Sequence, residues 1–90
     1  MNDVWSMIED DPKVAANLRA RSALMRALVR EIRTWDLSQV QIAAKLNMTQ
    51  ARVSELLNGK IDKFSLDALV RACPRAGLSV EFVMMEEETE

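Results

Sequence analysis

The apolar positions between residues 39 and 58 form two short helical faces separated by a four-residue turn. The first face consists of Ile42, Ala43 and Leu46, and the second consists of Val53, Leu56 and Leu57. Ala43 is small enough for another helix to cross close to its backbone. Two short faces of this kind, joined by a tight turn, are typical of a helix-turn-helix. The pattern therefore predicts two helices that cross near a right angle.

Capping residues bound both predicted helices. Ser38 and Gln41 have the spacing of a capping box, so the first helix begins directly after Ser38. Asn47 ends it, because asparagine enters the left-handed backbone region more readily than most residues. Thr49 caps the second helix, and the Asn-Gly step at residues 58–59 closes it.

A longer amphipathic helix precedes this pair. Asp11 is placed to cap it, and Pro12 stands at its first position, where the missing N–H costs nothing. The helix is expected to run to about Trp35. Its apolar positions recur at three- and four-residue steps with one larger gap at Arg21, and they are Val14, Leu18, Met25, Leu28, Ile32 and Trp35. This stripe predicts packing against the helix pair.

A further helix is predicted after the pair. Ser65 caps it, Pro74 makes its end irregular, and Gly77 stops it. Its apolar face consists of Leu66, Leu69, Val70 and Cys73.

Beyond Gly77 the pattern changes from helical spacing to alternation, which predicts a short β-strand over residues 78–85. A single strand leaves its backbone groups unpaired, and no second strand is evident. Its partner is therefore expected to be the same strand of another copy, or a strand of a different protein. The apolar positions of this expected dimer strand are Leu78, Val80, Phe82 and Met84.

Length and composition indicate one soluble domain. The chain has 90 residues, of which 49% are hydrophobic and 29% charged. We expect a single domain over residues 1–85 and a disordered acidic tail over residues 86–90. No apolar run is long enough for a bilayer, and the N-terminus has no signal-peptide pattern, so a cytoplasmic protein is expected. At this size a chain often gains stability from forming oligomers.

Composition also argues against several kinds of site. The chain has no histidine and one cysteine, which excludes an internal disulfide and leaves no zinc-ligand set. It shows no glycine-rich phosphate loop and no nucleophile–base pair, so we expect neither enzyme activity nor a cofactor. Cys73 lies on an apolar face, where a small buried thiol is favoured over a reactive one.

Positive charge is concentrated in the middle of the chain. Residues 1–12 carry four acids and no bases, a net charge of −4, and residues 76–90 carry five acids and no bases, a net charge of −5. Residues 13–75 carry twelve bases and five acids, a net charge of +7. This middle segment is able to bind phosphate although the whole chain has a net charge of −2. The acidic ends are either solvated tails or a screen for the basic face.

The outward positions of the second helix of the pair carry side chains suited to reading base edges. These are Gln50, Ala51, Arg52, Ser54 and Glu55. Glutamine pairs with adenine and arginine with guanine through two hydrogen bonds each, serine serves several bases, and alanine contacts the thymine methyl group. Glu55 has two interpretations. It accepts from cytosine N4, or it pairs with Arg52 three residues earlier, and the second is favoured.

Phosphate contacts are expected around the same two helices. Gln39 stands at the start of the first helix, where its amide and the free N–H groups of the helix terminus meet a phosphate. The other phosphate candidates are Thr49, Asn58, Lys60 and Lys63, with Lys45 weaker. The basic residues of the long helix, interpreted as a solvated face, are Arg19, Arg21, Arg26, Arg30 and Arg33.

Four stretches of the chain together carry a family resemblance. They are Asp10–Ser22, Leu37–Leu46, Thr49–Lys60 and Phe64–Val70. The sequence resembles the Xre/Cro-type helix-turn-helix family, and in particular its branch of small regulators that includes HigA-type antitoxins. Asn47 stands where that family usually has glycine.

The resemblance implies a mainly α fold, with a five-helix lambda-repressor-like DNA-binding core, to which the alternation adds the C-terminal strand. It also implies a homodimer on a palindromic double-stranded operator that represses its own promoter. By position, Gln39 would contact phosphate, and Gln50, Ala51, Ser54 and Glu55 would face bases. In the antitoxin members the partner is a toxin, commonly an RNase.

Two other interpretations stay open. Amphipathic helices with polar outer faces occur in every helical bundle. The chain is therefore alternatively a helical protein-interaction module, toxin-neutralising or other, without specific DNA binding. The apolar residues near the N-terminus are a candidate docking segment for a partner, although folding back on the chain's own core is favoured. They are Val4, Trp5, Met7 and Ile8.

Overall fold

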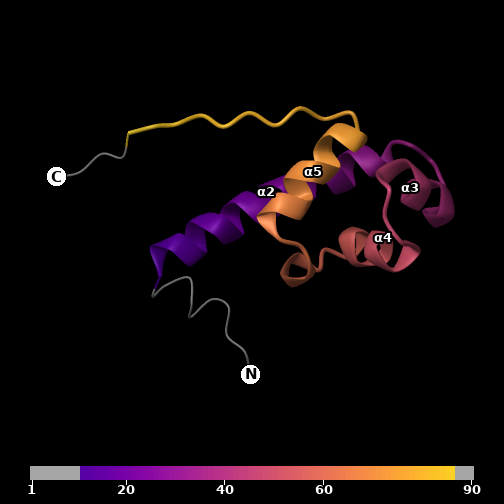
Figure 1. Ribbon diagram of the computed structural model, residues 1–90, viewed down its shortest axis with the longest axis horizontal. Helices are drawn as coiled ribbons and strands as arrows, with labels where there is room; N and C mark the ends of the chain where they lie inside the picture. The colour runs from indigo at the N-terminus through magenta and orange to yellow at the C-terminus, as the bar shows by residue number, and fades with distance from the viewer. Residues whose placement is uncertain (1–10, 87–90) are drawn as a thin grey trace, which may run out of the picture.

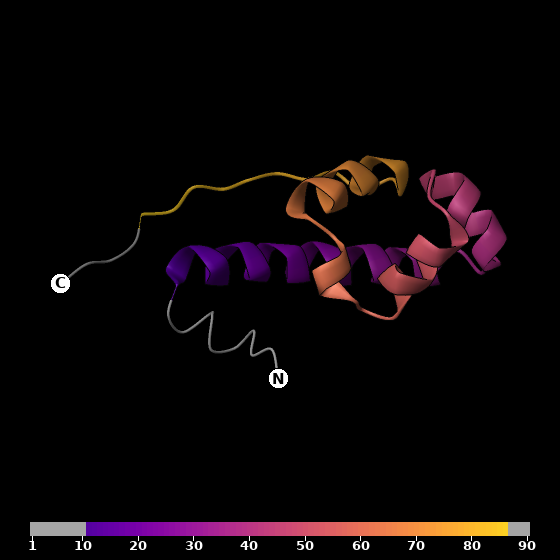
Figure 2. The ribbon, with the colours of Figure 1, turned by 60° about the horizontal axis from the view of Figure 1, so that its bottom comes forward.

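Four α-helices and one short 3-10 helix make up residues 11–86, the part of the chain that the computed structural model describes (Figure 1). They are α2 (Pro12–Arg33), α3 (Gln39–Leu46), α4 (Gln50–Leu57), η1 (Ile61–Lys63) and α5 (Leu66–Arg75). The 22-residue helix α2 is the longest. Helix α5 packs along it, and α3 and α4 pack against each other near the C-terminal end of α2 (Figures 1 and 2).

The helices begin at the residues that the sequence predicts. The Asp11 carboxylate accepts a hydrogen bond from the backbone N–H of Lys13 at 2.9 Å. At the start of α3 the capping box is complete, because Ser38 Oγ accepts from Gln41 N at 3.2 Å and Gln41 Oε1 accepts from Ser38 N at 2.9 Å. Ser65 likewise caps α5. Each side chain satisfies an N–H group that the helix itself leaves free, so these predictions are confirmed.

Three helices end in the same way, with a residue in the left-handed region. Asn47 (φ 55°), Gly59 (φ 69°) and Gly77 (φ 80°) follow α3, α4 and α5. After each of them the next N–H reaches back five residues, as in the bond from Met48 N to Ala43 O at 2.9 Å. This pattern is the Schellman motif, which satisfies the last carbonyls of a helix. The prediction that Asn47 ends α3 in the left-handed region is confirmed. Helix α2 ends at Arg33, two residues before the predicted end.

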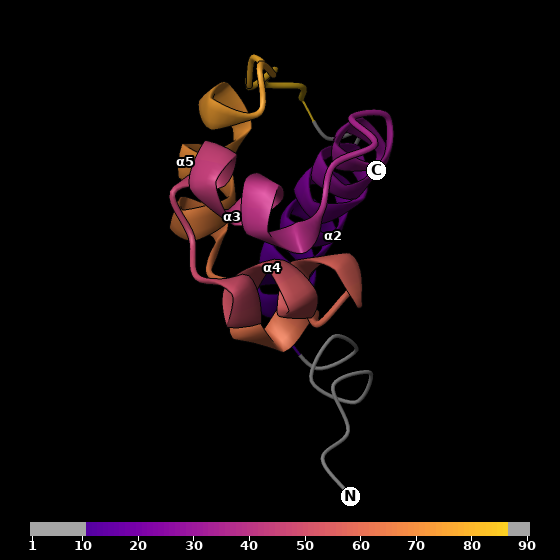
Figure 3. The same cartoon turned by 90° about the vertical axis from the view of Figure 1, so that its right-hand side faces the viewer.

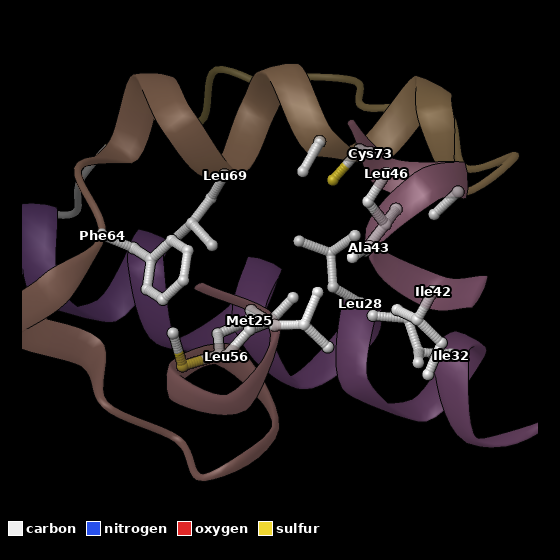
Figure 4. Close-up of a cluster of buried hydrophobic side chains, with 13 residues drawn as sticks. Met25, Leu28, Ile32, Ile42, Ala43, Leu46, Leu56, Phe64, Leu69 and Cys73 are labelled. Atoms are coloured by element: carbon white, nitrogen blue, oxygen red, sulfur yellow. The ribbon is translucent and has the colours of Figure 1, made fainter. Parts of the chain in front are cut away.

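All the main elements contribute to one hydrophobic core (Figure 4). The predicted faces of α3 and α4 are buried, with Leu46, Val53 and Leu56 fully inaccessible to solvent. Leu57 is half-buried. The other buried side chains of this cluster are Met25, Leu28, Ile32, Ile42, Ala43, Phe64, Leu69, Ala72, Cys73 and Ala76. The prediction that Cys73 is a buried thiol is confirmed. Burial raises the pKa of this thiol above its ordinary value.

The predicted C-terminal strand is wrong. Residues 78–86 are extended, but no part of residues 11–86 forms a β-ladder with them. A strand needs a paired neighbour, and every other regular element of the described chain is a helix. Leu78 and Val80 instead pack as half-buried side chains against the core, which accounts for the alternation at the start of this segment. Phe82 and Met84, two of the expected dimer-strand residues, are 70% and 93% exposed.

The predicted number of helices is also wrong. The described residues form four α-helices rather than five, and the segment between α4 and α5 makes a single 3-10 turn at Ile61–Lys63. Gly59 ends α4 and Ser65 caps α5, so only residues 60–64 lie between them. A segment of this length is too short for a stable α-helix.

Two predictions fall on residues that the structure does not describe. The apolar N-terminal segment with Val4, Trp5, Met7 and Ile8 lies outside residues 11–86, as do residues 87–90 of the acidic tail. Among the described helices, none combines the length and apolar character that a bilayer crossing requires.

Candidate nucleic-acid interface

Helices α3 and α4 lie at one end of the molecule, in front of α2 in the view of Figure 3. Three residues join them, and the last, Thr49, accepts a hydrogen bond from Arg52 N at its Oγ1 atom (3.1 Å). The cap fixes the direction of the first turn of α4. Gln50 and Ala51, on that turn, are both exposed. The structure therefore leaves an amide and a methyl group free at the N-terminus of α4.

Further along α4, the predicted base-reading side chains are less accessible. Arg52, Ser54 and Glu55 are half-buried. Ser54 is engaged by Asn58, whose Nδ2 donates to Ser54 O at 2.8 Å and to Ser54 Oγ at 3.3 Å. Asn58 thus helps to close the C-terminal end of α4 while remaining exposed.

The guanidinium of Arg52 turns away from the exposed start of α4 and onto the segment that follows α4. Its Cζ atom lies 4.0 Å from the centroid of the Phe64 ring. Its Nη1 atom donates to Lys63 O at 2.6 Å and lies 3.3 Å from Glu55 Oε1. The predicted pairing of Arg52 with Glu55 is present. Because these contacts use the planar group that would bind a guanine, they favour a positioning role for Arg52.

A second arginine, on α2, bonds to the same segment. Arg21 of α2 donates through Nη1 to Ile61 O at 3.2 Å and to Phe64 O at 3.4 Å, and its Nε donates to Asn17 Oδ1 at 2.7 Å. Arg21 was expected on a solvated face, but it is half-buried. Together the two arginines hold the carbonyl groups of η1 and its following residues.

The phosphate candidates lie around these elements. Lys60 and Lys63 are exposed at the start and end of η1. Gln39 is exposed at the start of α3, beside Val40, which is 59% exposed. The first N–H groups of a helix have no partner within it, so this end of α3 is favourable for an anion. Lys45, the weaker candidate, places its Nζ 4.1 Å from the centroid of the Trp35 ring.

Sequence reasoning missed two features of this surface. One feature of the sequence could have indicated that Arg21 bonds to the segment around η1, because this polar residue interrupts the apolar stripe of the long helix. A side chain that interrupts a buried stripe has to find buried partners, and here they are backbone carbonyls. The stacking of Arg52 on Phe64 had no local signal, because twelve positions separate the two residues.

Comparison with known proteins agrees with this geometry. The family model described as a helix-turn-helix domain matches residues 7–85. A solved structure described as an XRE-family transcriptional regulator superposes with a TM-score of 0.74 at 32% sequence identity, covering 81% of this chain and 82% of that chain. The chain belongs to the XRE-type helix-turn-helix family. No curated protein matches the sequence.

Proteins of the XRE-type family are DNA-binding regulators, and this chain belongs to that broad functional class. In helix-turn-helix proteins the second helix of the pair lies in the major groove, and α3 and α4 have the order and the short connection of such a pair. The family resemblance predicted from the sequence is confirmed at this level.

Proposed function

We propose that this XRE-type domain is a sequence-specific transcriptional regulator that binds a palindromic operator as a homodimer. The observation that carries the proposal is the exposed pair Gln50 and Ala51 on the capped first turn of α4. In helix-turn-helix proteins the N-terminal residues of the second helix contact base edges in the major groove. Gln50 would pair with adenine, and Ala51 would contact a thymine methyl group.

Phosphate contacts on both sides of α4 would set its depth in the groove. Gln39 is available at the start of α3 and Thr49 in the turn before α4, while Lys60 and Lys63 are available at the two ends of η1, after α4. Such contacts fix register and carry the salt-dependent part of affinity. Asn58 is proposed as a secondary phosphate contact, because its side chain already donates to Ser54.

Arg52 and Glu55 are proposed to support this surface. Arg52 holds η1 through Lys63 O and the Phe64 ring, and Glu55 holds Arg52. Base readout by Arg52 would require it to give up these contacts. The proposed readers of bases are therefore Gln50, Ala51 and Ser54, with Arg52 and Glu55 fixing the surface beside them.

Dimer formation follows from the small size of the recognition surface. One helix with a few exposed side chains at its start reads only a few bases. Two copies on a palindrome, with half-sites about 10 to 10.5 base pairs apart, would double the number of bases read.

A finer proposal is that the regulator is an autorepressing antitoxin. The sequence resembles the branch with HigA-type antitoxins, and its terminal segments are acidic, with net charges of −4 over residues 1–12 and −5 over residues 76–90. An RNase-type toxin needs a basic surface to hold RNA, so acidic segments suit such a partner. Co-expression with the product of the adjacent reading frame tests this role. Relief of a growth defect and a co-purifying complex support it, and their absence contradicts it.

The DNA-binding proposal is tested by selection from random duplexes, followed by footprinting on the selected sequence. We expect a palindromic consensus and two protected half-sites. A helical protein-interaction module would instead show little affinity for duplex DNA even at low salt, where phosphate attraction is strongest.

A further inference from the structure

A groove of about 720 Å³ lies between α2 and the segment that joins α4 to η1. Its apolar floor consists of Met25, Val29, Leu57 and Ile61, of which all but Met25 are half-buried and pack against the edge of the core. Of the residues proposed to contact DNA, only Asn58 lines this groove, and none belongs to its apolar floor. It is therefore an apolar surface without an assigned occupant.

The rim of the groove is basic. Arg26, Arg30 and Arg33 of α2 line it, all three are exposed, and no acidic residue of the described chain lines it. An apolar floor with three arginines on one wall suits an extended segment that is apolar at one point and acidic next to it.

The chain itself carries such a segment. Residues 82–85, Phe-Val-Met-Met, are 70%, 79%, 93% and 81% exposed, which is unusual for four consecutive large apolar residues. Residues 81–90 contain five glutamates and no basic residue, with three glutamates directly after Met85. The same chain thus displays an apolar and acidic segment and an apolar and basic groove.

The shape of the segment also favours a groove over a flat face. Successive side chains of an extended segment point to opposite sides, so a flat surface covers only one side of it. Val83 and Met85 would then stay exposed while Phe82 and Met84 were covered. A groove has walls on both sides, here α2 and the end of α4 with η1, and it contacts both sets of side chains.

The dimensions of the two surfaces match. The lining residues extend along α2 from Ser22 to Arg33, about 16 Å at the rise of an α-helix. From Phe82 to Glu86 an extended segment spans about 13 Å.

The position of the segment points to a second copy. Leu78 and Val80 are packed on the core of their own chain, so the exposed part begins at Glu81. From there the segment runs on the α5 side of α2, whereas α4 and η1 lie on the other side (Figures 1 and 2). To reach its own groove the segment would have to pass around α2.

We propose that Phe82–Met85 of one copy docks in the groove between α2 and η1 of a second copy, with the glutamates that follow facing Arg26, Arg30 and Arg33. The exchange is mutual, so two copies form a closed dimer with two identical contacts. This inference rests on the homodimer of the proposed function and identifies the surface through which the two copies contact each other. The contact involves no β-ladder between the copies.

Two charge-reversed chains test the exchange by sedimentation without DNA. The groove-reversed chain carries Arg26→Glu and Arg30→Glu, and the segment-reversed chain carries Glu86→Lys and Glu87→Lys. Either chain alone opposes like charges in both contacts, and we expect its dimer to dissociate about tenfold more readily than the unmodified dimer. In an equimolar mixture both contacts of the mixed dimer pair opposite charges, so dimers should return.

Controls separate this result from general effects of charge and folding. Lys13→Glu with Arg19→Glu makes the same change of net charge on exposed residues of α2 outside the groove and should leave the dimer constant unchanged. Circular dichroism should show the same helical content in every variant. Phe82→Ser with Met84→Ser should weaken the dimer without changing any charge.

The mixture gives the decisive outcome. Restored dimers support the exchange between copies. A mixture that stays monomeric, or an unmodified chain that stays monomeric at high micromolar concentration, overturns it, since a segment folded onto its own groove would not respond to mixing. Because no DNA is present, a dimer that exchanges segments but binds no operator would count against the proposed function and leave this inference standing.

Discussion

The guanidinium of Arg52 stacks on the ring of Phe64 at 4.0 Å and bonds to the carbonyl of the residue before it, Lys63, at 2.6 Å. Helix α4 is thereby tied to the entrance of α5 across η1. The lysines proposed to contact phosphate lie at the two ends of η1. Arg52 thus links the orientation of α4 to the position of those lysines.

Replacing Arg52 should therefore weaken binding to all DNA sequences alike. Arg52→Ala removes the stacking contact and the bond to Lys63 O, and we expect it to lower the free energy of unfolding by about 1–3 kcal/mol. Affinity for operator and for random duplex DNA should fall by similar factors. Arg52→Lys keeps the charge but loses the planar group, so it should recover little of either loss. A loss confined to the operator would instead make Arg52 a reader of bases.

Arg21 should contribute to the same segment from α2. Arg21→Ala removes hydrogen bonds to Ile61 O and Phe64 O, and we expect a loss of about 1–2 kcal/mol in chemical denaturation. The amide protons of Lys63 and Phe64, which bond within this turn, should exchange faster with solvent. Arg19→Ala is the matched control on the exposed side of the same helix and should change the free energy of unfolding by less than about 0.5 kcal/mol. Equal effects of the two substitutions would show that the hydrogen bonds of Arg21 to Ile61 O and Phe64 O do not stabilise the fold.

The helix boundaries were predictable from the sequence because they depend on local chemistry. Ser38, Thr49 and Ser65 act on N–H groups only three residues away, and Asn47 acts through its own backbone conformation. The faces of α3 and α4 were predictable for a similar reason, since helical spacing alone brings Ile42 and Leu46 to one side.

The remaining features depend on which distant elements meet. Alternation at residues 78–84 fits a strand, but it fits equally an extended segment whose Leu78 and Val80 pack on a helical core. Only the presence of a neighbouring strand distinguishes the two. The same limit applies to Arg52, Arg21 and the groove, because each joins segments whose approach is set by tertiary packing. The expected role of Arg52 in base readout came from its helical position and did not include the Phe64 ring.

Cys73 should report on the stability of the core at high pH. Burial raises the pKa of its thiol above its ordinary value of 9.0. A group with a raised pKa in the folded state contributes stability that is complete below the unfolded pKa and is lost as pH rises toward the folded pKa. The free energy of unfolding should thus decline above about pH 9. Cys73→Ala should lack this part of the decline, and an identical pH profile for both chains would contradict the assignment.

The last prediction separates base readout from phosphate contact. Gln50→Ala removes an exposed amide on the first turn of α4, and we expect a loss of about 1–3 kcal/mol on the operator with little change on random DNA. Lys60→Ala removes an exposed charge beside η1, so it should weaken both complexes alike and reduce the slope of log affinity against log salt by about 0.9. Titrations of both duplexes at several salt concentrations measure the two effects. If Gln50→Ala instead lowers affinity for the operator and for random DNA by the same factor, Gln50 does not read a base. In that case α4 lacks the principal base-reading residue that we propose for it.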